Sequence, residues 1–179
     1  MTTLATNTET KSSIKSEMLQ IVIGVGLLFG CAQVSIPLQP VPITLQTVAV
    51  MLIGLFYSKQ VAVKTVLSYL ALGTLGAPVF ANFSGGIAKL IGPTGGYLIG
   101  FLVAVYGMAA ARERILKDTY VSMICNCIIG NVLIFIPGIS WLSFYVGFSQ
   151  ALVLGFLPFI IPGAIKAVLL GAAVRYLKK

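Results

Sequence analysis

Six apolar segments dominate the pattern of this chain, joined by short basic turns on one side and by longer, proline-containing loops on the other. They cover residues 18–36, 43–57, 61–77, 95–111, 119–136 and 160–177. Segments of this length approach or reach the roughly 20 residues with which a helix crosses a bilayer. The pattern therefore predicts an all-α integral membrane protein, a bundle of six transmembrane helices. The second and third segments are short, so they need neighbouring helices or a locally thin bilayer to span it.

A further apolar segment, 141–157, is open to two interpretations. It is apolar enough to be a seventh span, but that would put the basic C-terminus on the side opposite to most other basic residues. We expect instead an outer-leaflet helix, or a partly inserted hairpin, that covers the outer mouth of the bundle.

Composition agrees with a membrane protein, since 58% of residues are hydrophobic and only 9% are charged. The net charge of +8 comes from basic residues that flank the spans, which favours a topological role over nucleic-acid binding. Ten of the twelve fall in one set of connections: Lys11, Lys15, Lys59, Lys64, Arg112, Arg114, Lys117, Arg175, Lys178 and Lys179. The positive-inside rule places this set, and both termini, in the cytoplasm. We expect a cytoplasmic tail over 1–17 and a six-helix transmembrane domain over 18–179, multi-pass in the cell membrane.

The prolines fall on the opposite side of the spans, at the junctions there. They are Pro37, Pro40, Pro42, Pro78, Pro93, Pro137, Pro158 and Pro162. This side contains structured loops and a single basic loop residue, Lys89, so it is where a binding site could form.

Catalytic chemistry is disfavoured. The chain contains no histidine, and its four acids, Glu9, Glu17, Glu113 and Asp118, all lie outside the spans. General acid–base catalysis and zinc binding at Cys125-x-Cys127 therefore lack partners. The glycine-rich segment 92–97 lacks the lysine of a Walker A loop. We expect neither an enzyme nor a cofactor.

Lys166 lies about one turn inside the outer end of the last span, on the side opposite to most basic residues. A charge there costs about 3 kcal/mol on insertion scales, and the spans contain no acid to pair with it. One interpretation is that its side chain snorkels to the outer interface. The other is that it faces a cavity, where an anionic ligand supplies the counter-charge.

Several polar residues are expected near the same side of the membrane as Lys166. Thr44 and Gln46 open the second span, Asn82 and Ser84 lie in the loop over 80–93, and Asn131 lies in the fifth span. For each, the simpler explanation is a hydrogen bond between helices. Candidate aromatic walls of a site are Tyr97, Phe80, Phe83 and Trp141.

The first span contains Gly26-x-x-x-Gly30. Small residues at this spacing allow helix backbones to approach closely. The motif serves either packing inside the bundle or docking of another membrane protein.

Four motifs in this order resemble the BioY family, the biotin-specific substrate-binding (S) components of energy-coupling factor (ECF) transporters. They are Pro40-Val-Pro-Ile-Thr-Leu-Gln-Thr47, Gly76-Ala-Pro-Val-Phe80, Gly92-Pro-Thr-Gly-Gly-Tyr-Leu-Ile-Gly-Phe101 and Pro162-Gly-x-x-Lys166. The resemblance covers roughly residues 18–177.

This resemblance implies an ECF S-component-like bundle that captures biotin in an outward-facing pocket, capped by the loop between spans one and two. It implies a separate transmembrane coupling subunit, docked through Gly26 and Gly30, and two ATPase subunits. The expected ligand-binding residues are Lys166, Asn82, Thr44, Gln46, Tyr97, Asn131, Ser84 and Phe80.

One position departs from the family pattern, which ends in Pro-Gly-Asp-x-x-Lys. Here the Asp position is read as Ala164, which leaves Lys166 without a protein partner and removes an acceptor for a ureido N–H. Asn82, Gln46 or Asn131 could replace that acceptor. Two alternatives to biotin uptake therefore stay open: an S component for another small vitamin, or a structural membrane protein without a ligand.

Overall fold

A computed structural model describes residues 2–114 and 119–177. Each of the six predicted spans corresponds to a helix: α1 (Thr2–Gln33), α2 (Gln46–Phe56), α3 (Lys59–Thr74), α5 (Gly95–Arg114), α6 (Tyr120–Val146) and α8 (Leu157–Leu177). Between them lie short elements: β1 (Ser35–Ile36), β2 (Ile43–Thr44), the 3₁₀ turn η1 (Ala81–Phe83), α4 (Ile87–Ile91) and α7 (Phe148–Gly155). The predicted all-helical architecture is confirmed.

Several of these helices are suited to a bilayer. Among the described residues, three stretches are long and apolar enough to cross it alone: Ile14–Gln33, Gly95–Glu113 and Val121–Val146. Helices α7 and α8 meet at a bend of 41° and together form a fourth candidate span. Helices α2 and α3 have only 11 and 16 residues, in agreement with the short apolar segments.

Local sequence sets where the helices begin and end. The Ser58 hydroxyl caps α3 by accepting from the Val61 N–H, and the Thr119 hydroxyl caps α6 by accepting from the Ser122 N–H. Such caps satisfy backbone donors that the first helical turn leaves free. Helix α6 ends at Gly147, whose φ of 81° is a conformation that glycine adopts at little cost.

Helix α6 is longer than predicted, and two prolines expected at junctions lie inside helices. Pro137 lies within α6 and Pro162 within α8. A proline removes one backbone hydrogen bond from a helix, but in membrane helices neighbouring groups can compensate for it. The sequence pattern therefore ended the fifth span too early, at residue 136.

The segment 141–157 is not a seventh span. Its first residues complete α6, and the eight-residue α7 follows and packs against α6 and α8. At 1.5 Å per residue this helix is only about 12 Å long, which is less than half of a bilayer core. That this segment covers the outer mouth of the bundle remains a prediction. None of residues 141–157, all of which the structure describes, lines the cavity of the bundle.

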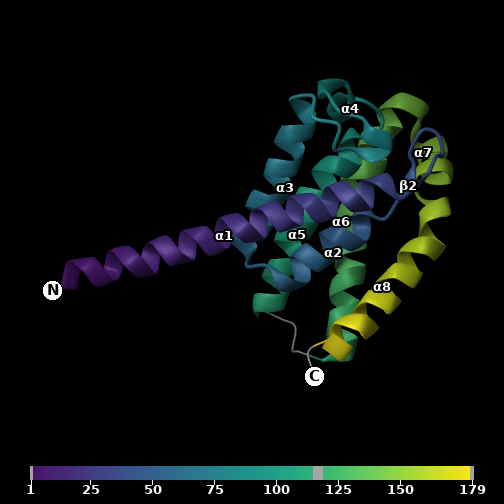
Figure 1. The fold of residues 1–179 in the computed structure, drawn as a ribbon. Coiled ribbons are helices and arrows are strands. Elements are labelled where there is room, and N and C mark those ends of the chain that lie inside the picture. Colours follow the sequence, from purple (N-terminus) through teal and green to yellow (C-terminus); the bar gives the residue numbers. More distant parts are fainter. Residues whose placement is uncertain (1, 115–118, 178–179) are drawn as a thin grey trace.

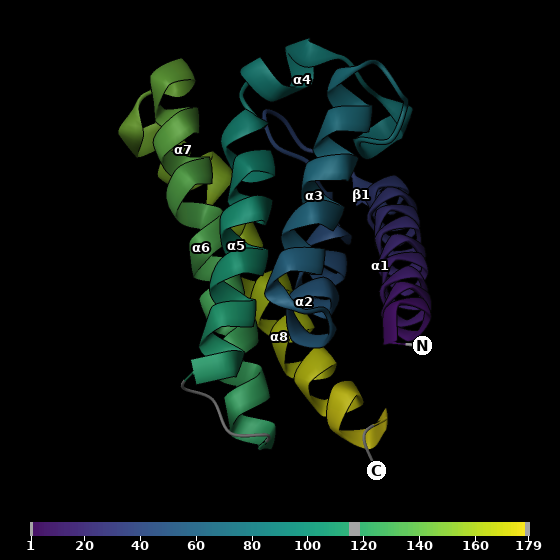
Figure 2. The same cartoon turned by 90° about the vertical axis from the view of Figure 1, so that its left-hand side faces the viewer.

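The connections sort to the two ends of the bundle as the charge pattern predicts. Figure 2 shows α4 and its flanking loops at one end, and the α2–α3 turn and the end of α8 at the other. Of all the helix pairs described, α5 and α6 share the most extensive contact. Gly100 on α5 allows the two backbones to approach closely. A Cβ at Gly100 would lie only 2.7 Å from the Ile134 carbonyl oxygen.

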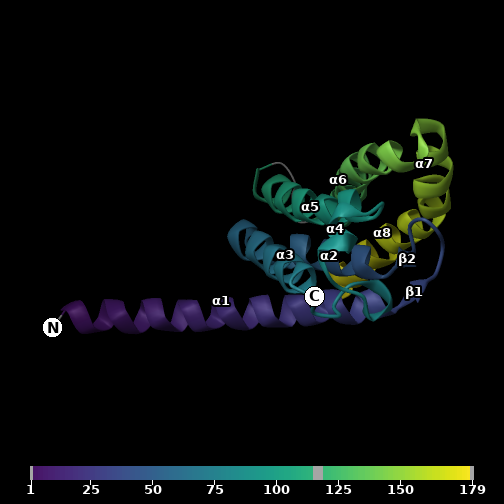
Figure 3. The same ribbon diagram turned by 90° about the horizontal axis from the view of Figure 1, so that it is seen from above.

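Helix α1 begins at Thr2, so residues 2–17 continue the first span as one helix. Its N-terminal part extends beyond the other helices (Figures 1 and 3). Its C-terminal half packs on α3 and α2, tied by a Lys64–Glu17 ion pair and by the Tyr57 hydroxyl, which donates to the Gln20 carbonyl at 2.9 Å. That residues 1–17 lie in the cytoplasm remains a prediction.

Candidate functional site

A cavity of about 440 Å³ lies among the helices of the bundle and the loops next to α4. Its walls come from the β1–β2 loop, the start of α2, the 80–84 segment, α4, α5, α6 and α8. All eight residues predicted to bind a ligand line it: Lys166, Asn82, Thr44, Gln46, Tyr97, Asn131, Ser84 and Phe80. This volume falls in the range of sites for small organic ligands. Residues spread over more than 120 positions of the chain thus share one site.

The loop between α1 and α2 forms one wall of this cavity. Strands β1 and β2 pair antiparallel, with Ser35 opposite Thr44, and close the loop at its base. Residues 37–42 line the cavity and include three prolines, which restrict the backbone to few conformations. The two-residue strands were not predicted, because so short a pair has no hydrophobic period of its own.

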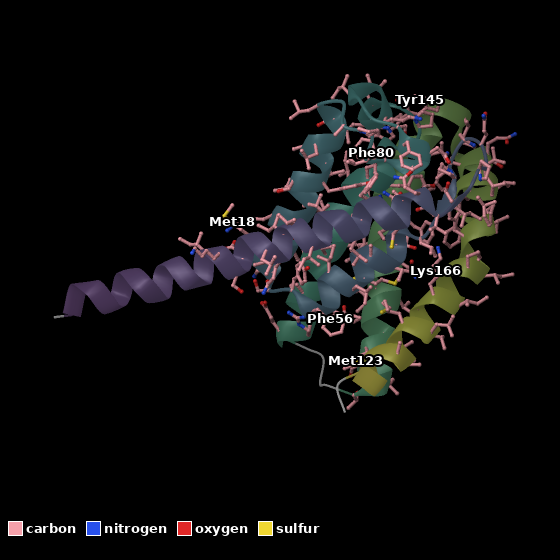
Figure 4. The ribbon with its side chains drawn as sticks, viewed as in Figure 1. Met18, Phe56, Phe80, Met123, Tyr145 and Lys166 are labelled. Carbon is pink, nitrogen blue, oxygen red and sulfur yellow. The ribbon has the colours of Figure 1, made fainter. Side chains whose placement is uncertain are left out.

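Lys166 lines the cavity, which supports the interpretation that it faces a cavity over the one in which its side chain snorkels to the outer interface. It lies nine residues into α8, half-buried, and its Nζ donates to the Thr44 carbonyl at 2.6 Å and to Thr47 Oγ1 at 3.3 Å. The expectation that Lys166 lacks a protein partner is therefore wrong. Figure 4 shows it along α8, whereas Phe80 lies nearer the end with α4. No acidic residue is among those that line the cavity, so the charge of Lys166 has neutral partners only.

Gln46 is almost fully buried, at 4% exposure, and belongs to a chain of hydrogen bonds. Its Nε2 donates to the Tyr69 hydroxyl at 2.7 Å, and that hydroxyl donates to the Val79 carbonyl at 2.8 Å. Its Oε1 accepts from Thr44 Oγ1 at 3.1 Å. This series of hydrogen bonds therefore connects Thr44 in β2 with the Val79 carbonyl next to Phe80.

The 80–84 segment is held by the end of α1. Gln33 Nε2 donates to the Phe80 carbonyl at 3.3 Å, and Gln33 Oε1 accepts from the Phe83 N–H at 2.9 Å. Asn82 Oδ1 accepts from Ser35 Oγ at 2.9 Å, and Asn82 adopts a φ of 58°. Left-handed backbone at a non-glycine residue costs free energy and is frequent at ligand sites.

Asn131 makes the helix–helix hydrogen bond that was the simpler explanation, and it also lines the cavity. Its Nδ2 donates to the Gly163 carbonyl at 3.3 Å. Because a carbonyl can only accept, the amide must turn its nitrogen to Gly163. Its Oδ1 accepts no hydrogen bond from the described residues, so it is available as an acceptor.

The aromatic wall differs in part from the prediction. Tyr97 packs with Phe135 and Phe159 at centroid distances of 6.4 Å, and Phe101 also lines the cavity. Phe83 and Trp141, two predicted walls, do not line it. Phe83 is 65% exposed and packs on Phe29, and the Trp141 indole donates to the Gly92 carbonyl at 3.0 Å.

The family's acidic position is better assigned to Gly163 than to Ala164. The family pattern places the acid three residues before the lysine, which from Lys166 leads to Gly163. Gly163 lines the cavity, whereas Ala164 is exposed and does not. A Cβ at Gly163 would have its nearest contact 3.6 Å away, at Asn131 Nδ2. The position thus has room for a side chain directed at the polar part of the site.

Gly26 and Gly30 lie on the outside of α1, away from the cavity. Both are exposed, and a Cβ at either would meet no atom within 4 Å. Gly24 is different, since its Cβ would lie 2.5 Å from the Thr65 side chain on α3. Of the two interpretations of the motif, packing inside this bundle is excluded for Gly26 and Gly30.

Known proteins resemble this chain in both sequence and fold. The BioY family model matches residues 3–179. A probable biotin transporter BioY of Pyrococcus horikoshii is 40% identical over 84% of this chain and 89% of its own length. The biotin transporter BioY of Thermotoga maritima is 37% identical over 93% of this chain and 95% of its own. The crystal structure of the S-component for biotin from an ECF-type ABC transporter superposes with a TM-score of 0.78 at 27% identity, covering 96% of this chain and 93% of that one.

The helical bundle with its cavity between the loops and helices is thus the S-component fold, and the chain is a multi-pass membrane component of a transporter. Within that class, the chain belongs to the BioY family. Family and fold are those of transport proteins, in agreement with the prediction that the chain is not an enzyme.

Proposed function

We propose that this protein binds biotin from the outer side of the membrane and delivers it inward. The observation that carries the proposal is the single cavity in which all four family motifs meet, lined by two lysines and no acid. An anionic ligand with a polar, uncharged ring system suits such a lining. A structural protein without a ligand would leave the converging polar side chains and the two lysines of this cavity without a role.

The parts of biotin suit different parts of the cavity. Its ureido group offers one carbonyl acceptor and two N–H donors, which Lys166 Nζ and the amide oxygens of Gln46 and Asn131 can pair with. Its ring system suits the aromatic wall around Tyr97. Its carboxylate suits Lys89, an exposed cation on α4 that lines the cavity and that the sequence analysis did not include in the site. The ring would then lie deep and the carboxylate near the mouth.

We further propose that a transmembrane coupling subunit and two ATPase subunits supply the energy. The exposed glycines of α1 support docking on a partner in the membrane, because they allow close backbone approach. The described residues contain no cluster of His, Cys, Asp or Glu that could hold a metal ion, so the proposed ligand is biotin without a metal.

Titration of the detergent-purified protein with biotin by calorimetry tests the ligand. Thiamine, riboflavin and pantothenate serve as comparison ligands, since another vitamin is the alternative. Uptake of labelled biotin by a biotin-auxotrophic host without its own importer, with and without a coupling module, tests transport. Heat of binding with biotin alone supports the proposal, and binding of another vitamin in its place would overturn it.

Restoring the family's acid at Gly163 is expected to strengthen biotin binding. In Gly163→Asp the carboxylate would lie beside Asn131 and one helical turn from Lys166, where it can accept a ureido N–H. A hydrogen bond to a charged group contributes about 1.5–3 kcal/mol, less the cost of desolvating the new charge, so we expect about a 3- to 30-fold gain. Calorimetry with biotin measures the change.

Ala164→Asp is the matched control for this substitution. It adds the same charge one residue away, at an exposed position outside the cavity. We expect no gain in biotin affinity from it. A gain with Ala164→Asp and none with Gly163→Asp would show that the acid belongs at Ala164 and that our assignment is wrong.

A further inference from the structure

Tyr69 is fully buried on α3 and does not line the cavity, yet it contacts two residues that do, Gln46 and Phe80. Its hydroxyl accepts from Gln46 at the start of α2 and donates to the Val79 carbonyl beside Phe80. Its ring packs edge-on against Phe80, with centroids 5.5 Å apart. The apolar pattern of the third span gave no sign of such a role.

The directions of these hydrogen bonds are fixed by one group. The Val79 carbonyl can only accept a hydrogen bond, so the Tyr69 hydroxyl must donate its single proton to it. Tyr69 must then accept from Gln46, and only the amide nitrogen of Gln46 can donate. The amide is thereby held with its nitrogen toward buried Tyr69 and its oxygen toward Thr44, which lines the cavity.

We propose that Tyr69 is a positioning residue that makes Gln46 Oε1 a fixed neutral acceptor for an N–H of the ligand. This proposal rests on the proposed binding of biotin, whose ureido group has two N–H donors. The cavity needs such an acceptor because no acid lines it. If the amide turned over, it would present a second donor next to Lys166 Nζ, which already donates to Thr44.

Tyr69→Phe tests the proposal, since it removes one oxygen atom and keeps the ring that packs on Phe80. Without the hydroxyl, the Gln46 amide loses its directing partner and one buried donor is left unpaired. We expect about a 5- to 30-fold loss of biotin affinity, measured by calorimetry on the detergent-purified chain.

Coupling to Gln46 separates this role from a merely structural one. In a Gln46→Met background the acceptor is absent, so Tyr69→Phe is expected to change biotin affinity less than 2-fold. An equal loss in both backgrounds, or no loss in the wild type, would overturn the proposal. Tyr57→Phe is the matched control: it removes a hydroxyl that donates to the Gln20 carbonyl, remote from the cavity, and should leave affinity unchanged.

A second measurement covers the case in which Tyr69→Phe does not fold. Biotin methylated at one or the other ureido nitrogen cannot donate there. For one of these two analogues, Gln46→Met and wild type are expected to bind equally, because the N–H that Oε1 would accept is missing. If Gln46→Met weakens both analogues as much as biotin, Gln46 Oε1 is not the acceptor. If the wild type does not bind biotin at all, the proposed function fails instead.

Discussion

Replacing Lys166 with methionine is expected to weaken biotin binding by about 10- to 150-fold, because a charge-assisted hydrogen bond contributes about 1.5–3 kcal/mol. Methionine keeps the length and apolar bulk of the side chain and removes the ammonium group. That group faces the cavity from α8, and among the described residues its hydrogen-bond partners are Thr44 and Thr47 alone. Both are neutral, so a ligand oxygen can replace them without breaking an ion pair. Calorimetry on the purified variant measures the loss.

Stability is expected to move in the other direction. A half-buried cation without an acid is costly in a membrane span, so Lys166→Met should unfold at the same temperature as the wild type or at a higher one. Lys64→Met is the control, since Lys64 is exposed and pairs with Glu17 on the surface. Exposed pairs contribute little, and biotin affinity should not change. Wild-type affinity in Lys166→Met would show that this lysine does not bind the ligand.

Most of the polar residues of the cavity could be predicted from the sequence. Polar side chains such as Asn131 and Gln46 are conspicuous in apolar segments, because each needs a hydrogen-bond partner there. Asn82 was proposed because it lies in a polar loop on the proline-containing side of the spans, and Lys166 because it is a cation near that side in a motif of the family. All of these residues line one cavity.

The apolar walls and the supporting residues could not be predicted in the same way. Phe135 and Phe159 line the cavity, but in segments that are apolar throughout, nothing distinguishes an aromatic residue at a cavity from one facing lipid. Tyr69 is a similar case, since its role depends on meeting Val79 and Gln46 across the fold. Trp141, a candidate wall, belongs instead to α6, which continues through Pro137, and its indole donates to the Gly92 carbonyl.

The register of the last motif shows a different limit. Counting forward from Pro162 assigns the acidic position to Ala164, and counting back from Lys166 assigns it to Gly163. The motif here is one residue shorter than the family's, so sequence alone cannot decide between them. The cavity decides, because Gly163 lines it and Ala164 does not.

The face of α1 that points away from the bundle and carries Gly26 and Gly30 is the other region where a substitution should have a large effect. Gly26 and Gly30 leave open space beside the helix, and nearby Val22 and Ile23 are exposed apolar residues. A helix of another membrane protein can approach closely at such a face. If the proposed coupling subunit docks there, bulk at either glycine will separate the two backbones.

Gly26→Leu and Gly30→Leu are therefore expected to reduce energised biotin uptake at least about 10-fold while leaving biotin affinity of the purified protein within about 2-fold of wild type. Uptake is measured in cells that contain the coupling module, and affinity by calorimetry in detergent. Neither leucine contacts the described part of this chain at its Cβ, so the fold and the cavity should be retained.

Two matched controls separate docking from packing. Gly26→Ala and Gly30→Ala add one methyl group and favour the helix, so uptake should fall much less than with leucine. Gly24→Leu would instead force its side chain against Thr65 and Tyr57, and it should reduce stability and biotin binding together. Normal uptake in both leucine variants would exclude this face as the docking surface. Loss of binding along with uptake would show that Gly26 and Gly30 support the binding site rather than a partner.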